Sequence, residues 1–149
     1  MLAHLSDRIA ARELETVARG LSWEAECLET RLMTQSAGPG NVLLLEIQCE
    51  AVHEVITSFG ARGTSAETVA ERAVEQVKDY IANGAPIGVH LADQILLPLA
   101  LAGAGSYRTL PPSRHLLTNI DVIRQFLDVE IRTEALESGC WQVSIGERS

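Results

Sequence analysis

A single histidine at the start of an apolar helical segment is the residue of this sequence with the clearest chemical potential. His115 follows the turn at 111–114 (PPSR) and precedes a segment with helical periodicity at 116–127. The backbone N–H groups at such a helix start favour anions. A histidine ring offers a neutral nitrogen at physiological pH, so it can attack phosphorus and pass the bound group onward. The residue types alone also fit a helix cap or a plain surface histidine, and both readings stay open.

A second polar cluster lies at the start of another apolar segment, at 90–94 (HLADQ). Asp93 is suited to a metal ion or a ribose hydroxyl, and Gln94 to hydrogen bonds with nucleotide edges or phosphate oxygens. Taken alone, both side chains are better explained as the polar face of a helix. The glycines of the 103–105 turn (GAG) could hold a phosphate, but a helix C-terminal stop explains them better.

Three linked blocks carry a more specific signal than any of these residues singly. They are 90–94 (HLADQ), 101–105 (LAGAG) and 112–119 (PSRHLLTN). In this order and spacing they resemble the C-terminal part of the RNA 3'-terminal phosphate cyclase family, and a weaker likeness extends back through 38–41 and 69–80. The resemblance implies an ATP-dependent ligase that converts an RNA 3'-terminal phosphate to a 2',3'-cyclic phosphate through a covalent histidyl-AMP intermediate.

The resemblance also implies a role for each residue of the blocks. His115 is the nucleophile that becomes adenylylated, and the partners are ATP, RNA with a 3'-terminal phosphate and a divalent metal, Mg²⁺ or Mn²⁺, with Asp93 as a candidate ligand. The ATP-binding residues would be His90, Leu91, Ala92, Asp93 and Gln94. Candidate phosphate-binding or supporting residues around the histidine are Arg114, Thr118 and Asn119.

Two other function classes stay open on the sequence. One is a non-catalytic, cyclase-like factor of ribosome assembly, against which the histidine at 115 argues. The other is a small α+β interaction or oligomerisation module without a nucleotide site, which the helical and alternating patterns would fit equally well.

The charge balance limits the partners of the chain. A net charge of −8 over 149 residues argues against broad nonspecific binding of nucleic acid. Residues 105–119 nevertheless contain Arg108 and Arg114 and no acid, which makes a local cationic strip around His115. The longest apolar stretch, 95–104, is shorter than the roughly 20 residues that span a bilayer. The N-terminus lacks a secretory pattern, so we expect cytoplasmic residence and no membrane partner.

Local patterns predict the elements of the first half of the chain. Ser6 predicts the cap of a helix that stops at Gly20. Strands are predicted over 23–33, 42–50 and 53–59. Cys49 falls on the apolar side of the second of these, so we expect a buried, reduced thiol. The three cysteines are widely spaced without a C-x-x-C pair, which favours structural thiols over zinc ligands or a redox site.

The second half begins with the strongest helical pattern. Thr64 and Glu67 predict a capping box, and the helix is expected to end at Asn83-Gly84. A module boundary is placed near Ala85. Further elements are predicted as a helix over 89–102, a strand over 107–110, a helix over 116–127 and strands over 129–135 and 140–145.

The predicted fold class is α+β, with two small α/β modules at 1–85 and 86–149. The resemblance implies that the first is most of the cyclase insert domain with its first strand missing. It implies that the second is the last part of the main domain, whose repeat unit has two helices on a four-stranded sheet. Family members are longer, so we expect a truncation or split gene that needs the missing N-terminal half and tends to self-associate through exposed edges.

Overall fold

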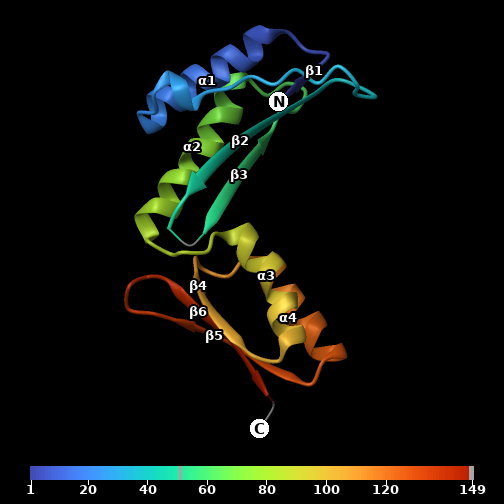
Figure 1. The fold of residues 1–149 in the computed structure, drawn as a ribbon, viewed down its shortest axis with the longest axis vertical. Coiled ribbons are helices and arrows are strands. Elements are labelled where there is room, and N and C mark those ends of the chain that lie inside the picture. Colours follow the sequence, from blue (N-terminus) through green and yellow to red (C-terminus); the bar gives the residue numbers. More distant parts are fainter. Residues whose placement is uncertain (51, 148–149) are drawn as a thin grey trace. The chain divides into compact units, whose positions relative to one another are not determined.

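The computed structural model describes residues 1–50 and 52–147. They form a mixed α+β fold, as predicted, with four α-helices and two three-stranded sheets (Figure 1). The chain divides into two compact units, Met1–Gln48 with Val55–Asp79, and Cys49–Glu54 with Tyr80–Ser149. The sequence modules 1–85 and 86–149 stay a prediction. No helix among the described residues has both the length and the apolar character to cross a membrane.

The first helix, α1 (Asp7–Leu21), begins where the sequence predicts and ends later. The Ser6 hydroxyl accepts a hydrogen bond from the N–H of Arg8, which confirms the predicted cap. The predicted stop at Gly20 is wrong, because the helix continues to a left-handed residue, Ser22. A Cβ at Gly20 would come within 2.8 Å of the Val74 side chain. This glycine therefore allows α1 to approach α2 closely rather than ending the helix.

The predicted strand over 23–33 is wrong. The segment forms a short 3-10 helix, η1 (Ala25–Cys27), and then an irregular stretch in which Leu32 makes an isolated bridge with Leu2 of β1 (Leu2–Ala3). None of the side chains at 23–33 is fully buried. The stretch therefore lacks the buried face that stabilises a strand.

The first sheet has the order β1-β2-β3, with β2 spanning Gly40–Gln48 and β3 His53–Phe59. Burial alternates along β2 as the sequence pattern predicts, and Leu43 and Leu45 face inward. The prediction that Cys49 is buried is wrong: β2 ends one residue earlier, and Cys49 is exposed in the following turn, where its N–H bonds to the C=O of Val52. The reversal of the chain there turns Cys49 out of the apolar face.

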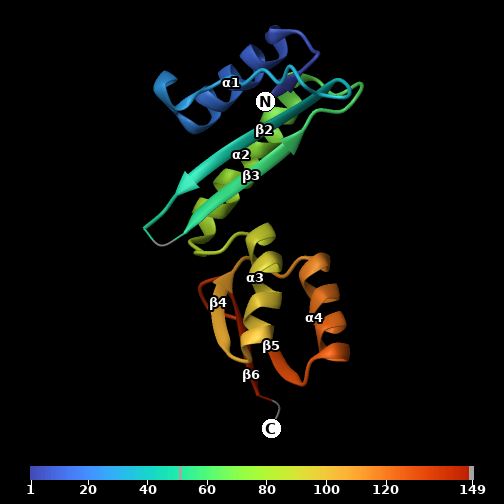
Figure 2. The same cartoon turned by 45° about the vertical axis from the view of Figure 1, so that its right-hand side comes forward.

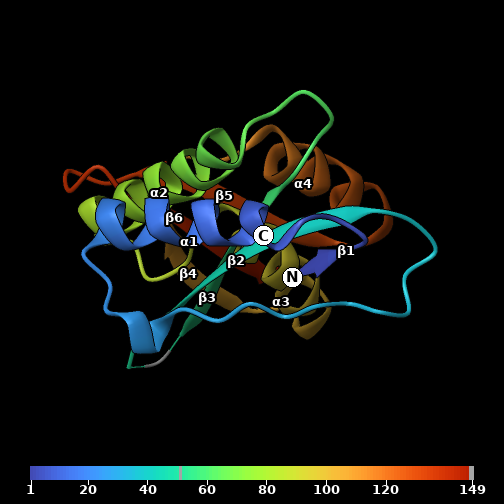
Figure 3. The ribbon, with the colours of Figure 1, turned by 90° about the horizontal axis from the view of Figure 1, so that it is seen from above.

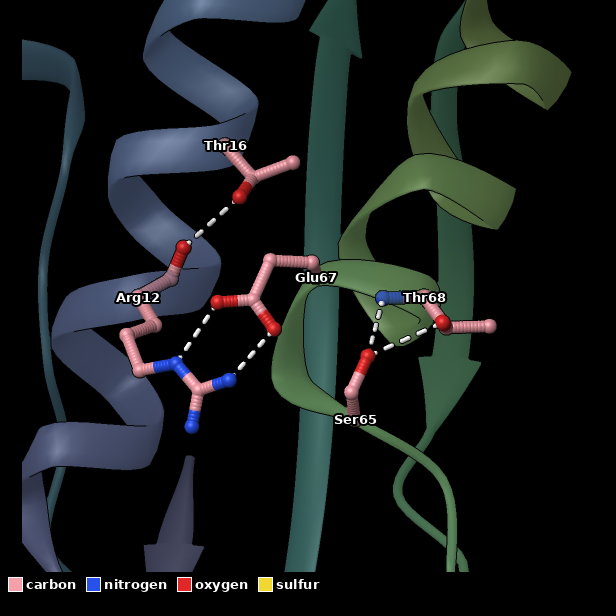
Figure 4. Close-up of polar contacts among 5 residues, drawn as sticks. All are labelled: Arg12, Thr16, Ser65, Glu67 and Thr68. Atoms are coloured by element: carbon pink, nitrogen blue, oxygen red, sulfur yellow. Dashed lines mark hydrogen bonds and ion pairs between the residues drawn. The ribbon is translucent and has the colours of Figure 1, made fainter.

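The second helix, α2 (Ala66–Asn83), ends as predicted at Gly84, which has a positive φ of 62°. The capping box of Thr64 and Glu67 is wrong. The cap comes from Ser65, whose hydroxyl accepts a hydrogen bond from the N–H of Thr68 at 3.1 Å (Figure 4). Glu67 turns instead to Arg12 of α1, with both its oxygens 2.6 Å from guanidinium nitrogens. This guanidinium lowers the pKa of the Glu67 carboxyl.

The second unit packs two helices on one face of a sheet (Figure 2). The helices are α3 (Val89–Ala102) and α4 (Arg114–Phe126). The strands are β4 (Gly105–Thr109), β5 (Val129–Ala135) and β6 (Trp141–Glu147), antiparallel in the order β4-β6-β5. All five elements lie close to their predicted bounds. Leu96, Leu116, Ile131 and Val143 are at most 1% exposed and form the centre of the core. The described residues supply three strands, so a four-stranded repeat stays a prediction.

The close contact of Gly20 with Val74 gives a test of the first unit. Gly20→Ala would normally stabilise a helix by about 1 kcal/mol, but overpacking costs about 1–3 kcal/mol. We expect a net loss of unfolding free energy in urea titration. Adding Val74→Ala should make the double variant less destabilised than the sum of the single variants. Gly38→Ala is the control, because nothing lies within 4 Å of a Cβ there. Full additivity of Gly20→Ala and Val74→Ala would contradict the packing argument.

Candidate functional site at the start of α3 and α4

The two polar blocks of the sequence lie on neighbouring helices. Residues 90–94 occupy the first turns of α3, and residues 114–119 the first turns of α4. Both helices run in the same direction and begin at the same end of the second unit (Figure 2). The side-chain amide of Asn119 donates a hydrogen bond to Oδ1 of Asp93 at 2.5 Å. The fold thus brings together two blocks that are 26 residues apart at this pair.

Local hydrogen bonds fix the start of α4. Ser113 is the N-cap, and its hydroxyl accepts a hydrogen bond from the N–H of Leu116 at 3.1 Å. The Thr118 hydroxyl donates to the C=O of Arg114 at 2.8 Å, so Thr118 supports the helix rather than pointing a free hydroxyl at a ligand. His115 is exposed in the first turn. It lies four residues before Asn119 and therefore on the same helix face, one turn nearer the N-terminus.

The start of α3 is held by groups that the sequence analysis did not identify. Its N-cap is Gly88, which has no side chain to cap the helix. The buried carboxylate of Glu54 accepts a hydrogen bond from the Gly88 N–H at 3.0 Å instead. Glu54 belongs to the same compact unit, although it comes from β3. No local motif could have revealed this partner, because the cap comes from a distant strand.

Tyr107 of β4 supports the 90–94 block through a hydrogen bond to its backbone. Its hydroxyl donates a hydrogen bond to the C=O of Ala92 at 2.8 Å, and both residues are buried. Burial, and next the charge of Asp93, raise the pKa of the Tyr107 phenol above its ordinary value, so the phenol stays a donor. Its position just after the 103–105 turn was the one sequence signal for this role.

The remaining residues of the α3 block differ in their exposure. His90 and Gln94 are exposed, Leu91 and Asp93 are half-buried, and Ala92 is buried. Pro98 lies inside the helix four residues after Gln94. Because proline has no N–H, the C=O of Gln94 lacks its usual partner in the helix. The block therefore contains one backbone acceptor without the usual donor one turn later.

Residues 1–50 and 52–147 hold no cluster of three His, Cys, Asp or Glu side chains that could bind a metal ion. Asp93 has one carboxylate oxygen engaged by Asn119.

Comparison with known proteins gives the family of this chain. Residues 1–82 match the family model for the insert domain of RNA 3'-terminal phosphate cyclase (RTC). The chain belongs to the RNA 3'-terminal phosphate cyclase family. A relative of that name from Ectopseudomonas mendocina is 48% identical over 131 residues, covering 88% of this chain and 38% of the relative. One from Koribacter versatilis is 44% identical over 148 residues, covering 99% of this chain and 41% of the relative.

The family likeness extends beyond the insert domain. The Koribacter alignment includes almost the whole chain, and therefore both polar blocks. A cyclase from Salmonella enteritidis is 52% identical over 102 residues, which cover 68% of this chain and 30% of that protein. The chain thus spans about two fifths of the length of the first two relatives. The resemblance seen in the sequence is confirmed at the level of the family.

The Asp93–Asn119 bond can be tested by a double-mutant cycle on unfolding free energy. A hydrogen bond to a charged group contributes about 1.5–3 kcal/mol when buried, and this half-buried pair should show a coupling of about 1 kcal/mol between Asp93→Ala and Asn119→Ala. Gln94→Ala with Asn119→Ala is the matched control and should be additive, because Gln94 is exposed on the same helix. Additivity in both pairs would mean that the bond does not join the helices in solution.

Proposed function

We propose that this chain carries the nucleotide-transfer site of an ATP-dependent RNA 3'-terminal phosphate cyclase, with His115 as the residue that becomes adenylylated. The observation that supports the proposal best is the pairing of the two blocks through Asp93 and Asn119, with His115 exposed one turn away on the same face. Membership of the family supplies the reaction class. The proposal concerns the whole enzyme, because the chain spans only part of its relatives.

The proposed reaction has three transfers at phosphorus. A ring nitrogen of His115 attacks the α-phosphorus of ATP, a P–N bond forms and pyrophosphate leaves. An oxygen of the RNA 3'-phosphate then attacks that phosphorus, the P–N bond breaks and AMP passes to the RNA end. The neighbouring 2'-hydroxyl finally attacks the 3'-phosphorus, which closes the 2',3'-cyclic phosphate and releases AMP.

The residues around His115 have distinct parts in this scheme. His90, Leu91, Ala92, Asp93 and Gln94 would form one side of the ATP site, with the exposed Gln94 available to the nucleotide. Arg114 is exposed beside the histidine and would help to neutralise phosphate charge. Asn119 orients Asp93, and Thr118 supports the helix that presents the ring.

A divalent metal ion, Mg²⁺ or Mn²⁺, stays part of the proposal as a companion of the ATP phosphates. Mg²⁺ is commonly held by one or two carboxylates together with substrate phosphates. Asp93 is the one carboxylate of the two blocks, so a single protein ligand fits this mode of binding. The steps above depend on the residues of the chain and are not routed through the ion.

The role of His115 predicts a specific loss of labelling. With the N-terminal half of a related cyclase supplied, ATP labelled at the α-phosphate should give a protein–AMP adduct that is labile to acid and stable to alkali. His115→Ala should abolish this adduct, because an acid-labile, alkali-stable bond to phosphorus is a P–N bond and His115 is the one histidine of the 112–119 block. His4→Ala, a change in the other unit, should leave it intact. An adduct that persists in His115→Ala would place the nucleophile elsewhere.

The partial coverage of the relatives predicts the behaviour of residues 1–149 alone. We expect no cyclisation of an RNA 3'-phosphate in the presence of ATP and Mg²⁺, because contacts to ATP and RNA from other segments would be missing. Activity should return when a matching N-terminal half is supplied in cis or in trans. The assay measures phosphatase-resistant RNA ends. Robust turnover by the monomeric chain alone would show that its site is self-sufficient.

A further inference from the structure

Two buried side chains of the insert-domain segment belong by their contacts to the second unit. The family match covers residues 1–82, and most of these form the first unit, in which α1 lies along α2 (Figure 3). Glu54 of β3 and Tyr80 of α2 are the exceptions of interest, because both are counted with the second unit. They are 3% and 5% exposed. Each makes a hydrogen bond to the loop that leads into α3.

The start of α3 needs an anchor that its own sequence does not supply. Its N-cap, Gly88, has no side chain that could cap the helix. The Glu54 carboxylate accepts a hydrogen bond from the Gly88 N–H at 3.0 Å, and a charged acceptor is stabilising at a helix N-terminus. Two residues earlier, the Tyr80 hydroxyl donates to the C=O of Pro86 at 3.0 Å. Burial raises the pKa of the Tyr80 phenol, so this donor keeps its proton at physiological pH.

Pro98 makes the first half of α3 depend more strongly on this anchor. Because proline has no N–H, one hydrogen bond between the two halves of the helix is missing. The first half keeps the bond from the N–H of Ala92 to the C=O of Gly88 at 2.9 Å. Ala92 is the middle residue of the 90–94 block, and its own C=O accepts from Tyr107. The position of Gly88 therefore determines the position of this block.

The start of α4 has an anchor of its own. The hydroxyl of Ser113 caps the helix, and the C=O of Ser113 accepts from the N–H of Leu117 at 3.0 Å. His115 lies within that first turn. Loss of the Glu54 anchor should thus displace the 90–94 block more than it displaces His115.

We propose that Glu54 is a positioning residue of the nucleotide site: through the N–H of Gly88 it holds the 90–94 block in place, which gives the insert domain a part in ATP binding. The inference rests on the proposed function, in which this block forms one side of the ATP site. Glu54 acts through Gly88 and has no need to touch the nucleotide. Tyr80 supports the same loop at Pro86.

A positioning role differs from a purely structural one in what a loss of the anchor changes. A residue that only stabilises the fold lowers the amount of folded chain, and with it the yield of adduct at every ATP concentration. A residue that holds the ATP block raises the ATP concentration needed for half-maximal labelling and leaves the rate at saturating ATP nearly unchanged. The two roles are therefore separable by an ATP titration.

The first test measures the ATP concentration that gives half-maximal formation of the His115–AMP adduct, with the N-terminal half of a related cyclase supplied. Glu54→Leu removes the acceptor and should raise this concentration about tenfold, which corresponds to the loss of one hydrogen bond. The rate at saturating ATP should change by less than about twofold. Glu54→Gln keeps an oxygen acceptor and should restore the parent value. Ile56→Val is the matched control, because Ile56 is buried on the same face of β3 and its truncation lowers stability without touching Gly88.

The second test approaches the same hydrogen bond from Gly88. A Cβ at this position would lie 2.6 Å from the carboxyl carbon of Glu54, so Gly88→Ala must displace that side chain. We expect Gly88→Ala to raise the half-saturating ATP concentration as Glu54→Leu does. Added to Glu54→Ala, the same change should have little further effect, because the bond is already lost and the smaller side chain leaves room. Additive effects of Gly88→Ala and Glu54→Ala would overturn the inference.

Hydrogen exchange tests the anchor on the purified chain without ATP. Glu54→Leu should speed exchange at the N–H of Ala92, which bonds to the N-cap of α3, and not at Leu117, which bonds to the N-cap of α4. If the parent chain forms no adduct, the proposed function fails, and this comparison still decides whether Glu54 holds the block. Thermal melting shows which variants are folded. The inference is overturned by parent-like ATP dependence in folded Glu54→Leu or Gly88→Ala, by equal faster exchange at both N–H groups, or by loss of folding in both variants, which would make the role structural.

Discussion

The apolar core that buries Leu96 and Leu116 between two helices and the β4-β6-β5 sheet is the constraint on which the candidate site depends. Full burial of a leucine contributes about 1.5–3 kcal/mol, whereas a typical hydrogen bond adds about 1 kcal/mol. The core therefore sets where α3 and α4 lie. The bond of Asn119 to Asp93 then selects one orientation of each side chain within that frame. Polar residues at the helix starts meet because the apolar stripes beneath them pack.

The start of α3 has a second constraint, which comes from Glu54 near the start of β3. Glu54 accepts a hydrogen bond from the N–H of Gly88, and a Cβ at position 88 would overlap its carboxylate, so a larger residue would displace the Glu54 side chain from this bond. The hydroxyl of Tyr80 donates to the C=O of Pro86 at 3.0 Å, and burial raises the pKa of that phenol to about 12. The loop from α2 to α3 is thus held by hydrogen bonds at Pro86 and Gly88. The position of the block at 90–94 depends on residues distant in sequence.

Sequence patterns predict those parts of the structure that local physics determines. The helix at 89–102 and the strands at 53–59 and 129–135 follow from periodicity and turn residues, and they have the bounds that the pattern gives. The predictions that are wrong concern residues whose roles depend on tertiary contacts. Local sequence suggests a helix stop at Gly20, because it does not show that Val74 packs against this residue. It suggests a capping role for Glu67, because it does not show that Arg12 of another helix is the partner. The hydrogen bond between the two polar blocks has no local signature, because it joins two helices.

The charges close to a site, more than the net charge of −8 of the whole chain, decide whether an anion is favoured there. At physiological ionic strength, exposed charges more than about 8 Å apart are largely screened. The segment 105–119 carries Arg108 and Arg114 without an acid, and both arginines are exposed. Further along α4, Oδ1 of Asp121 lies 3.6 Å from a guanidinium nitrogen of Arg124, which offsets its charge. An anion near the start of α4 therefore meets a helix N-terminus and the exposed Arg114.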